Sequence, residues 1–226
     1  IYYKNIENFY VFFPQTDIAI TPDDLNLNYK NVYFYSQDGE RLNGWFFSSG
    51  KDSPVIIYCH GNACNISHLL EYTALLIERD LQVLIFDYRG YGKSTGRPSE
   101  NGIYLDTQAA YNYLTGEERI PSERIVLAGH SIGAAAAIEV AAKNKVRSVI
   151  IESAFTSIRD MSKTMFPMKL ISFFLPKNYN NLEKVANINA PKLFIHGQMD
   201  NIVPFEMAER LFGASMEPKF LYQVKG

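Results

Sequence analysis

A serine between two glycines, where a buried strand turns directly into a helix, constrains this chain more than any other feature. Residues 125–128 are apolar and indicate a strand, and the G-x-S-x-G motif at 129–133 leads at once into an alanine-rich helical segment. The flanking glycines lack a Cβ, so strand and helix approach closely while the hydroxyl is exposed on a strained turn. The pattern predicts Ser131 as a nucleophile, and the N–H of Ile132, at the positive end of the helix, as an oxyanion donor.

Strand-like and helix-like segments alternate along the rest of the chain. Residues 31–36 and 41–48 alternate in polarity around an Asp-Gly turn and predict a hairpin. The order of segments predicts an α/β fold with a mostly parallel, doubly wound sheet and the antiparallel N-terminal hairpin at one edge. Apolar runs typical of strands buried on both faces lie at 54–59, 81–86, 125–128, 146–151 and 192–195, and helical segments at 66–79, 99–114, 132–143 and 204–211.

Composition is that of a globular protein with one core. With 226 residues, of which 47% are hydrophobic, we expect a single domain over residues 1–226. The net charge of -2 and the lack of a basic tract argue against a nucleic-acid partner. Two cysteines do not make a disulfide framework, and no apolar run approaches the ~18 residues that a membrane span needs.

Polar clusters follow the predicted strands at their carboxyl ends. Because the carboxyl ends of parallel strands meet at one edge of a sheet, where α/β proteins bind ligands, we expect these clusters to form one site. They are His60-Gly61-Asn62-Ala63, the run 87–92, Ser131, Glu152-Ser153 and the run 196–200.

A serine hydroxyl needs a base to remove its proton, and a carboxylate to orient that base. In hydrolases with this motif the acid and the histidine follow the serine in that order. Asp200 is the predicted acid, although an aspartate before a helix can also be a turn or N-cap residue. Glu152, one strand earlier, is the competitor, but a glutamate at a strand end is often a support for neighbouring loops.

The four histidines, His60, His68, His130 and His196, all precede Asp200. We expect His60 and His196 to hold loops, His68 to be solvated or to cap a helix, and His130 to point away from the serine. Since residues 219–226 read as the last strand, we expect the catalytic histidine just after Gly226. The chain would then be a fragment of a longer protein, impaired for lack of this base.

The second oxyanion donor is expected in the loop after residue 59. We predict the backbone N–H of Asn62, with Gly61 allowing close approach. Cys59, Cys64 and His68 invite a zinc interpretation, but their spacing fits no usual structural-zinc pattern, so we expect no metal and no cofactor.

Three further segments are expected to have structural roles or to border the site. Asp87 and Arg89, side by side after a strand, are expected to form a loop-fixing ion pair. Residues 155–189, rich in Met, Phe and Leu, are predicted to be a small helical lid that offers an apolar wall to an acyl chain, or else to pack on the core. The aromatic residues within 1–15 are expected to pack on the core or to lie near a bilayer.

These motifs together resemble the α/β-hydrolase superfamily, and more narrowly the ABHD-type serine hydrolases, which are often tethered to membranes by an upstream segment. The resemblance implies Ser131 as nucleophile, Asp200 as acid, and the N–H groups of Asn62 and Ile132 as oxyanion donors. It also implies ester or thioester hydrolysis and a histidine after the last strand. The motifs that carry it are residues 60–63 with 65–68, 87–94 through 97–100, 129–133, 153–158 and 196–200.

We therefore expect a serine hydrolase that cleaves carboxylic esters or thioesters with an apolar acyl group through an acyl-enzyme. The alternatives are a non-catalytic, hydrolase-like binding protein and a serine peptidase for small peptides. Membrane proximity through an upstream segment is expected only by resemblance, and the sequence assigns no compartment.

Overall fold

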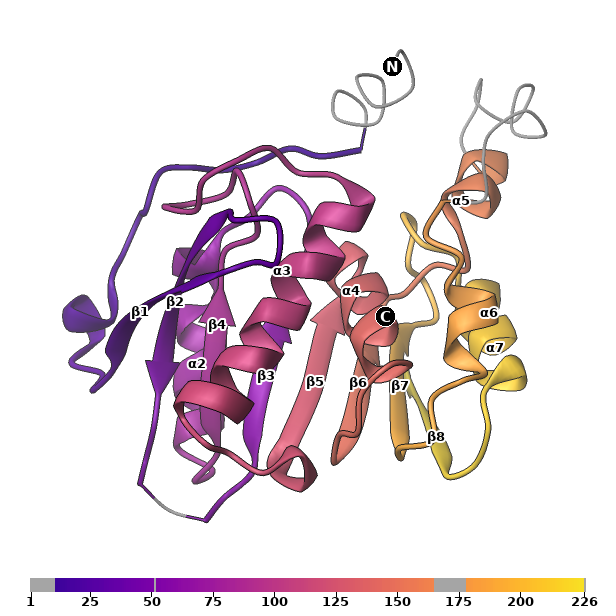
Figure 1. The fold of residues 1–226 in the computed structure, drawn as a ribbon. Coiled ribbons are helices and arrows are strands. Elements are labelled where there is room, and N and C mark those ends of the chain that lie inside the picture. Colours follow the sequence, from indigo (N-terminus) through magenta and orange to yellow (C-terminus); the bar gives the residue numbers. More distant parts are fainter. Residues whose placement is uncertain (1–10, 51, 165–177, 226) are drawn as a thin grey trace.

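The computed structural model describes residues 11–50, 52–164 and 178–225, which fold around one eight-stranded sheet (Figure 1). The strand order is β1-β2-β4-β3-β5-β6-β7-β8, with the first two strands antiparallel to their neighbours and all others parallel. This confirms the predicted mostly parallel sheet with an antiparallel hairpin at one edge. The strands are β1 (Lys30–Tyr35), β2 (Arg41–Phe47), β3 (Val55–Cys59), β4 (Gln82–Phe86), β5 (Ile125–His130), β6 (Ser148–Glu152), β7 (Lys192–Gly197) and β8 (Lys219–Val224).

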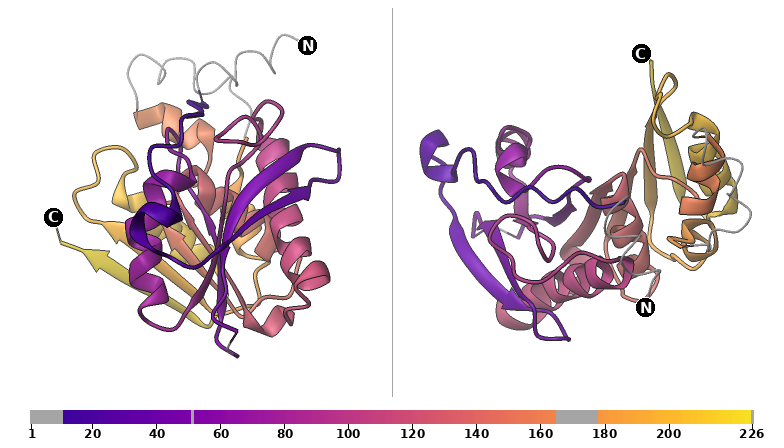
Figure 2. Two further views of the ribbon diagram at one scale, coloured as in Figure 1. Left: turned by 90° about the vertical axis from the view of Figure 1, so that its left-hand side faces the viewer. Right: turned by 90° about the horizontal axis from the view of Figure 1, so that it is seen from above.

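Helices cover both faces of this sheet. Figure 2, left, shows α2 and α3 on opposite sides of the strands. The regular helices are α2 (Leu70–Ile77), α3 (Glu100–Asn112), α4 (Ile132–Ala141), α5 (Ile158–Thr164), α6 (Asn181–Val185) and α7 (Phe205–Ala214). Short 3-10 turns are η1 (Pro22–Leu25), η2 (Ile66–Leu69) and η4 (Ser122–Arg124), and a π-helical turn, η3 (Tyr113–Glu117), extends α3.

Two hydrophobic cores explain why the central strands are apolar throughout. Along β3, Val55, Ile57 and Cys59 belong to the larger core with α3 and α4, whereas Ile56 and Tyr58 belong to the smaller core with η2 and α2. Successive strand residues point to opposite faces. Since both faces are covered, every residue of β3 and of β4 is buried.

Helix α4 is buried over its whole length, which its alanines allow. A helix that is apolar all round belongs in a core, and small side chains let it lie close to the strands. Its first residue follows Ser131 directly, so the packing of α4 against the sheet also positions the serine.

The predicted lid, residues 155–189, divides into described and undescribed parts. Helix α5 lies at the upper edge of the molecule (Figure 1), and α6 packs near α4 and α7. The stretch with most of its Met, Phe and Leu residues, 165–177, lies outside the described residues.

The N-terminal segment, of which residues 1–10 lie outside the description, crosses the molecule on the side where the strands β3 to β7 end (Figure 1). Phe12 is buried in the larger core, whereas Phe13 is 52% exposed. Within the described ranges, none of the helices combines the length and apolarity needed to cross a membrane.

Candidate active site

Ser131 lies on a strained turn between β5 and α4. Its φ of 56° and ψ of -114° put a non-glycine residue where few side chains are tolerated. A Cβ on Gly129 would collide with the backbone of Gly133, and a Cβ on Gly133 would collide with the carbonyl oxygen of Cys59 at the end of β3. Both glycines of the motif are therefore required by close backbone approach, as the sequence suggested.

The loop after β3 packs against this turn. A Cβ on Gly61 would lie 2.7 Å from Nδ1 of His130, so Gly61 and the residue before the serine are in contact. Ile132 is the first residue of α4, and the first N–H groups of a helix have no intrahelical partner. The loop that carries Asn62 and the N-terminus of α4 thus lie beside the same turn.

The side chain of Asn62 is held by the N-terminal segment. Its Oδ1 accepts hydrogen bonds from the N–H of Phe13 (3.0 Å) and the hydroxyl of Tyr91 (2.8 Å), and its Nδ2 donates to the carbonyl oxygen of Val11. Sequence reasoning selected Asn62 for its backbone N–H and missed this role of the side chain. No local pattern could reveal it, because the partners lie 29 to 51 residues away.

We call residues 11–19 the N-terminal strap, because further hydrogen bonds tie them to the loops around the site. The carbonyl oxygen of Gln15 accepts from Gly92 N (2.9 Å) and from Asn65 Nδ2 (3.2 Å). Ala19 N donates to Ser67 Oγ (3.2 Å). The strap therefore connects the loop after β3 to the loop after β4.

Asp200 lies in the loop after β7. Its Oδ1 accepts hydrogen bonds from the N–H groups of Ile202 and Val203, both 2.9 Å, and its Oδ2 lies 3.5 Å from Nε2 of His196. Burial tends to raise the pKa of this carboxyl, but these two N–H groups, His196 and the hydroxyl of Ser153 outweigh burial and lower the pKa. Asp200 is therefore ionised at neutral pH.

A cavity of about 370 Å³ joins the loops that follow β5, β6 and β7. It reaches the serine turn through His130 rather than through Ser131 itself. Because β6 lies between β5 and β7 in the sheet, Ser131 and Asp200 share one edge of the sheet with Glu152 between them. The lining residues are His130, Glu152, Ser153, Ile195, His196, Gly197, Met199, Asp200 and Val224.

Glu152 holds neighbouring strands together. Its Oε2 accepts a hydrogen bond from the hydroxyl of Tyr58 (3.0 Å), and its carbonyl oxygen accepts from the N–H of Ser131 (2.9 Å). The first contact reaches from β6 across β5 to β3, and the second joins β6 to the turn after β5, which favours the supporting role over that of catalytic acid.

Three of the four histidines have structural partners. His60 Nδ1 donates to the carbonyl oxygen of Gly61 (2.8 Å), and His196 Nε2 donates to that of Val203 (2.8 Å). His68 Nδ1 accepts from the N–H of Asn65 (3.1 Å) at the start of η2. His130 is exposed. The expected loop-holding and capping contacts are present.

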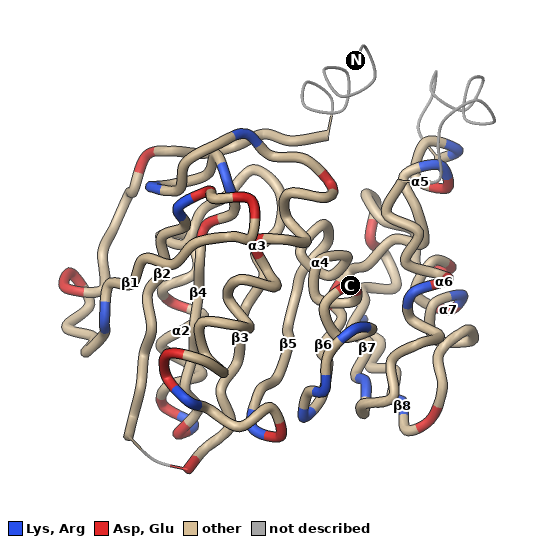
Figure 3. The backbone as a smooth tube through the Cα atoms, in the orientation of Figure 1, with Lys and Arg blue, Asp and Glu red and all other residues tan. Residues whose placement is uncertain are grey.

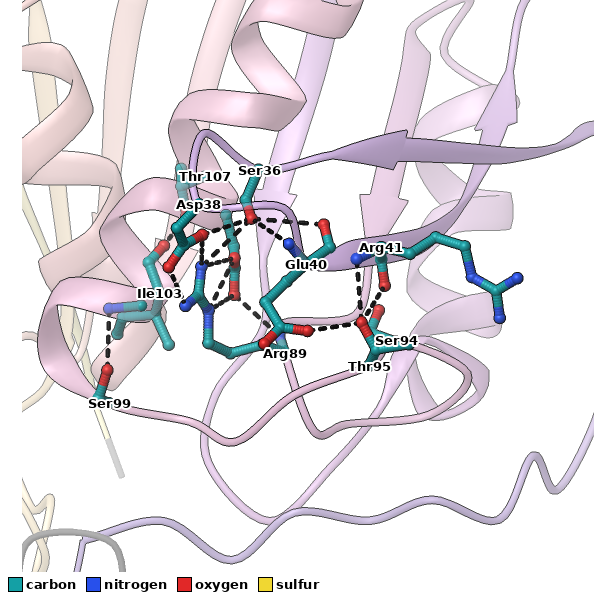
Figure 4. A network of polar contacts seen from close by, with 12 residues as sticks. Ser36, Asp38, Glu40, Arg41, Arg89, Ser94, Thr95, Ser99, Ile103 and Thr107 are labelled. Atoms are coloured by element: carbon teal, nitrogen blue, oxygen red, sulfur yellow. Dashed lines mark hydrogen bonds and ion pairs between the residues drawn. The ribbon is translucent and has the colours of Figure 1, made fainter.

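The expected ion pair between Asp87 and Arg89 is wrong. Arg89 instead binds Asp106 on α3 (2.8 Å) and Asp38 in the turn between β1 and β2 (2.7 Å). Figure 4 shows Arg89 beside Asp38. Asp87 turns the other way, where its Oδ1 accepts a hydrogen bond from the N–H of Ile66 (3.0 Å). The chain leaves the strand after residue 86, so side chains two apart no longer share a face.

The two thiols are neutral. Burial raises the pKa of Cys59 to about 12 and that of Cys64 to about 11. Cys59 lies inside β3, and Cys64 Sγ donates to the carbonyl oxygen of Gly61 (3.1 Å). In the ranges that the structure covers, no three His, Cys, Asp or Glu side chains gather in a way that would hold a metal ion.

Lys and Arg positions are interspersed with Asp and Glu positions along the described backbone (Figure 3). Around the cavity, the charged lining residues are the carboxylates of Glu152 and Asp200. The site therefore presents a serine on a strained turn, the loop that carries Asn62 and the start of α4 beside that turn, and an ionised aspartate across the same sheet edge.

Comparison with known proteins gives a consistent result. Residues 54–176 match the model of the alpha/beta hydrolase fold family. An uncharacterized protein of Mycobacterium tuberculosis is 36% identical over 218 residues, which cover 96% of this chain and 78% of that protein. Protein bem46 of Schizosaccharomyces pombe is 37% identical, covering 88% of this chain and 71% of its own. An esterase structure from Pyrococcus furiosus, 25% identical, superposes with a TM-score of 0.80 over 96% of this chain and 90% of that one.

Proposed function

The chain belongs to the alpha/beta hydrolase fold family, and from that premise we propose that it is a serine esterase with Ser131 as its nucleophile. The observation that carries the proposal is the backbone of Ser131, held at a φ of 56° between two glycines that admit no side chain. Strain of this kind persists where a function needs it. The similarity to a solved esterase supports the reaction class.

In the proposed reaction, Ser131 Oγ attacks the carbonyl carbon of the ester while a base takes its proton. The carbonyl oxygen becomes an oxyanion, which the backbone N–H groups of Asn62 and Ile132 stabilise. One such donor typically contributes ~3 kcal/mol to transition-state stabilisation. The base passes the proton to the leaving oxygen, so the alcohol departs and an acyl-enzyme remains. Water, deprotonated by the same base, then attacks the acyl carbonyl, and the proton returns to Ser131 Oγ as the acid leaves.

Asp200 is the proposed acid of the triad. As a carboxylate it orients the base and stabilises the imidazolium that forms. Its position after β7, across the sheet edge from Ser131, and its lowered pKa support this role. Glu152 is the less suitable group because Tyr58 already occupies its Oε2.

We propose a histidine after β8 as the base, because His60, His68 and His196 are each engaged with backbone groups. His130 packs against Gly61 and is adjacent to Ser131 on a sharp turn. The order serine, acid, histidine along the chain is the order that this motif implies.

The proposed substrates are carboxylic esters or thioesters with an apolar acyl group. Met199 lines the cavity and is 71% exposed, and the nearby Ile202 is 77% exposed. Exposed apolar side chains on the loop that carries Asp200 favour an apolar group of the substrate beside the site. Neither a metal nor a cofactor has a role in this mechanism.

A fluorophosphonate label tests the proposal, because it reacts only with an activated serine. On the full-length protein we expect the label on Ser131, found by peptide mapping, together with hydrolysis of short p-nitrophenyl esters. Ser131→Ala should lower kcat/KM by about 10⁴-fold or more. Ser49→Ala, an exposed serine at the opposite edge of the sheet, is the matched control and should keep the wild-type rate. A folded protein that takes no label would instead favour the non-catalytic binding protein.

A further inference from the structure

His60 and Asp87 form a buried pair that the proposed mechanism does not use. His60 directly follows β3 and Asp87 directly follows β4, and both side chains are 0% exposed. His60 Nε2 lies 3.7 Å from Asp87 Oδ1. The charge of a buried imidazole and a buried carboxyl that face each other depends on which of their atoms carry protons.

The hydrogen bonds determine which nitrogen of His60 carries a proton. A carbonyl oxygen only accepts, so the contact between His60 Nδ1 and Gly61 O (2.8 Å) puts a proton on Nδ1. In the neutral ring Nε2 is then an acceptor. Among the described residues Nε2 has no hydrogen-bond partner, and the same is true of Asp87 Oδ2.

An ionised Asp87 would also be only an acceptor. Two buried acceptors would then face each other, and an unsatisfied buried polar group is costly. One proton on the carboxyl relieves this conflict, because a donor O–H instead of a second acceptor then faces Nε2 across 3.7 Å. The alternative, an imidazolium beside a carboxylate, would bury two charges.

The groups around the pair favour the neutral form. Tyr88 and Tyr91 pack against the imidazole, with distances between ring centroids of 4.3 and 5.2 Å. The neutral thiol of Cys64 lies 3.6 Å from Nδ1. The charges of His68 from η2 and of Lys93 from the loop after β4 act at longer range, and the backbone N–H of Lys93 also lowers the pKa of Asp87. Lys93 and His68 both carry exposed side chains, so no buried cation faces Asp87 within the described chain.

Burial moves the two groups in the directions that keep the pair neutral. It lowers the pKa of His60 to about 4, and it raises the pKa of Asp87 to about 7 against the N–H groups of Ile66 and Lys93. Both directions agree with the hydrogen-bond argument.

We propose that Asp87 is protonated in the folded protein near neutral pH, presents its O–H rather than a carboxylate to His60 Nε2, and so holds the loop that carries Asn62. The pair reaches both ends of that loop. His60 O accepts from the hydroxyl of Tyr88 (3.0 Å), and Asp87 Oδ1 accepts from the N–H of Ile66 (3.0 Å). Asp87 is thus a positioning residue. Its link to catalysis rests on the proposed esterase function, whereas its protonation does not.

The test is the pH dependence of thermal unfolding in the wild type and in Asp87→Asn. A carboxyl whose pKa rises from 3.8 unfolded to about 7 folded binds more protons in the folded state. Stability from this group is therefore lost as pH rises from about 4 to about 7. The wild-type Tm should fall relative to that of Asp87→Asn by about 3–5 °C per pH unit in this window. Equal slopes, or a wild-type Tm that rises relative to the variant, would overturn the proposal.

Two further measurements keep the test decisive if a variant folds poorly. A carboxylic-acid C=O band should appear in the infrared difference spectrum of wild type minus Asp87→Asn at pH 6, and its absence would contradict a protonated Asp87. In ester hydrolysis, Asp87→Ala should lower kcat/KM at least tenfold, and Asp87→Asn should recover most of that loss because its amide presents a neutral donor to Nε2 as the protonated carboxyl does. Since Tm and infrared bands need no turnover, they separate failure of this proposal from failure of the esterase proposal.

Discussion

Two histidine–aspartate pairs lie at the same edge of the sheet and have opposite protonation. His60 and Asp87 approach to 3.7 Å, and His196 and Asp200 to 3.5 Å. The difference begins with the histidine. His60 donates to a carbonyl oxygen through Nδ1 and presents a bare Nε2 to its aspartate, whereas His196 donates through Nε2, the nitrogen nearest its aspartate.

The surroundings of the carboxyls complete the difference. Asp200 is 18% exposed and receives two backbone N–H groups on Oδ1, so its pKa is lowered. Asp87 is fully buried, and burial raises its pKa to about 7. The same two residue types thus give a charged carboxylate in one loop and a neutral acid in the other. The number of hydrogen-bond donors to a carboxyl and its exposure to solvent decide whether it is charged, whereas the residue type alone does not.

The largest expected effect is on turnover, where Asp200 and Asp87 should differ because they have different roles. Asp200→Asn should lower kcat by about 10⁴-fold, because an amide no longer orients or stabilises the base. Asp87→Asn preserves a donor toward His60 and should cost far less. Both are measured as kcat and KM for a p-nitrophenyl ester with the full-length protein. Similar losses in the two variants would contradict the proposed division between acid and positioning residue.

A third aspartate, Asp106, allows the charge of Asp87 to be tested by the free energy of unfolding. Asp106 is as buried as Asp87 but faces Arg89, and burial still raises its pKa, to about 6, against that guanidinium. Asp106→Asn leaves a buried cation with one fewer partner and should lower the free energy of unfolding by about 3 kcal/mol. Asp87→Asn should cost nothing at pH 7, because the wild-type carboxyl has by then lost the stability that its raised pKa gives at low pH, whereas the amide needs no proton to stay neutral. Urea unfolding of both variants measures this, and equal costs would indicate that Asp87 is also ionised.

The smallest effect concerns the second support of the Asn62 loop, which is its set of hydrogen bonds to the N-terminal strap. Asn62→Ala removes the contacts to the N-terminal strap and should lower kcat about tenfold with little change in KM, because the backbone donor is displaced from the oxyanion. Tyr91→Phe, which removes only one hydroxyl from Oδ1, is the matched control and should have a smaller effect. A larger loss in Tyr91→Phe than in Asn62→Ala would show that the strap is not what holds the loop.

The sequence was sufficient for features that depend on neighbours in the chain. The apolar runs predicted β3 and β4 because both faces of these strands are buried. The two glycines around Ser131 predicted the close approach of strand and helix, which the backbone of β5 and α4 confirms. The loop-holding contacts expected of His60 and His196 are present as well.

The sequence could not predict contacts between residues that are distant along the chain. The expected Asp87–Arg89 pair was wrong because Arg89 binds Asp38, 51 residues earlier, and Asp106, 17 residues later. Adjacent charges in a sequence do not pair when the chain bends between them. The role of the Asn62 side chain was missed for the same reason, since the strap that binds it is distant in sequence.

By itself, then, the sequence determined the alternation of strands and helices and the strained turn at Ser131, because periodicity and the absence of a Cβ are local properties. Only the tertiary structure decided which aspartate is charged, which nitrogen of each histidine carries a proton, and what holds the Asn62 loop. Those properties depend on burial and on donors that come from other elements, and the folded chain alone brings them together.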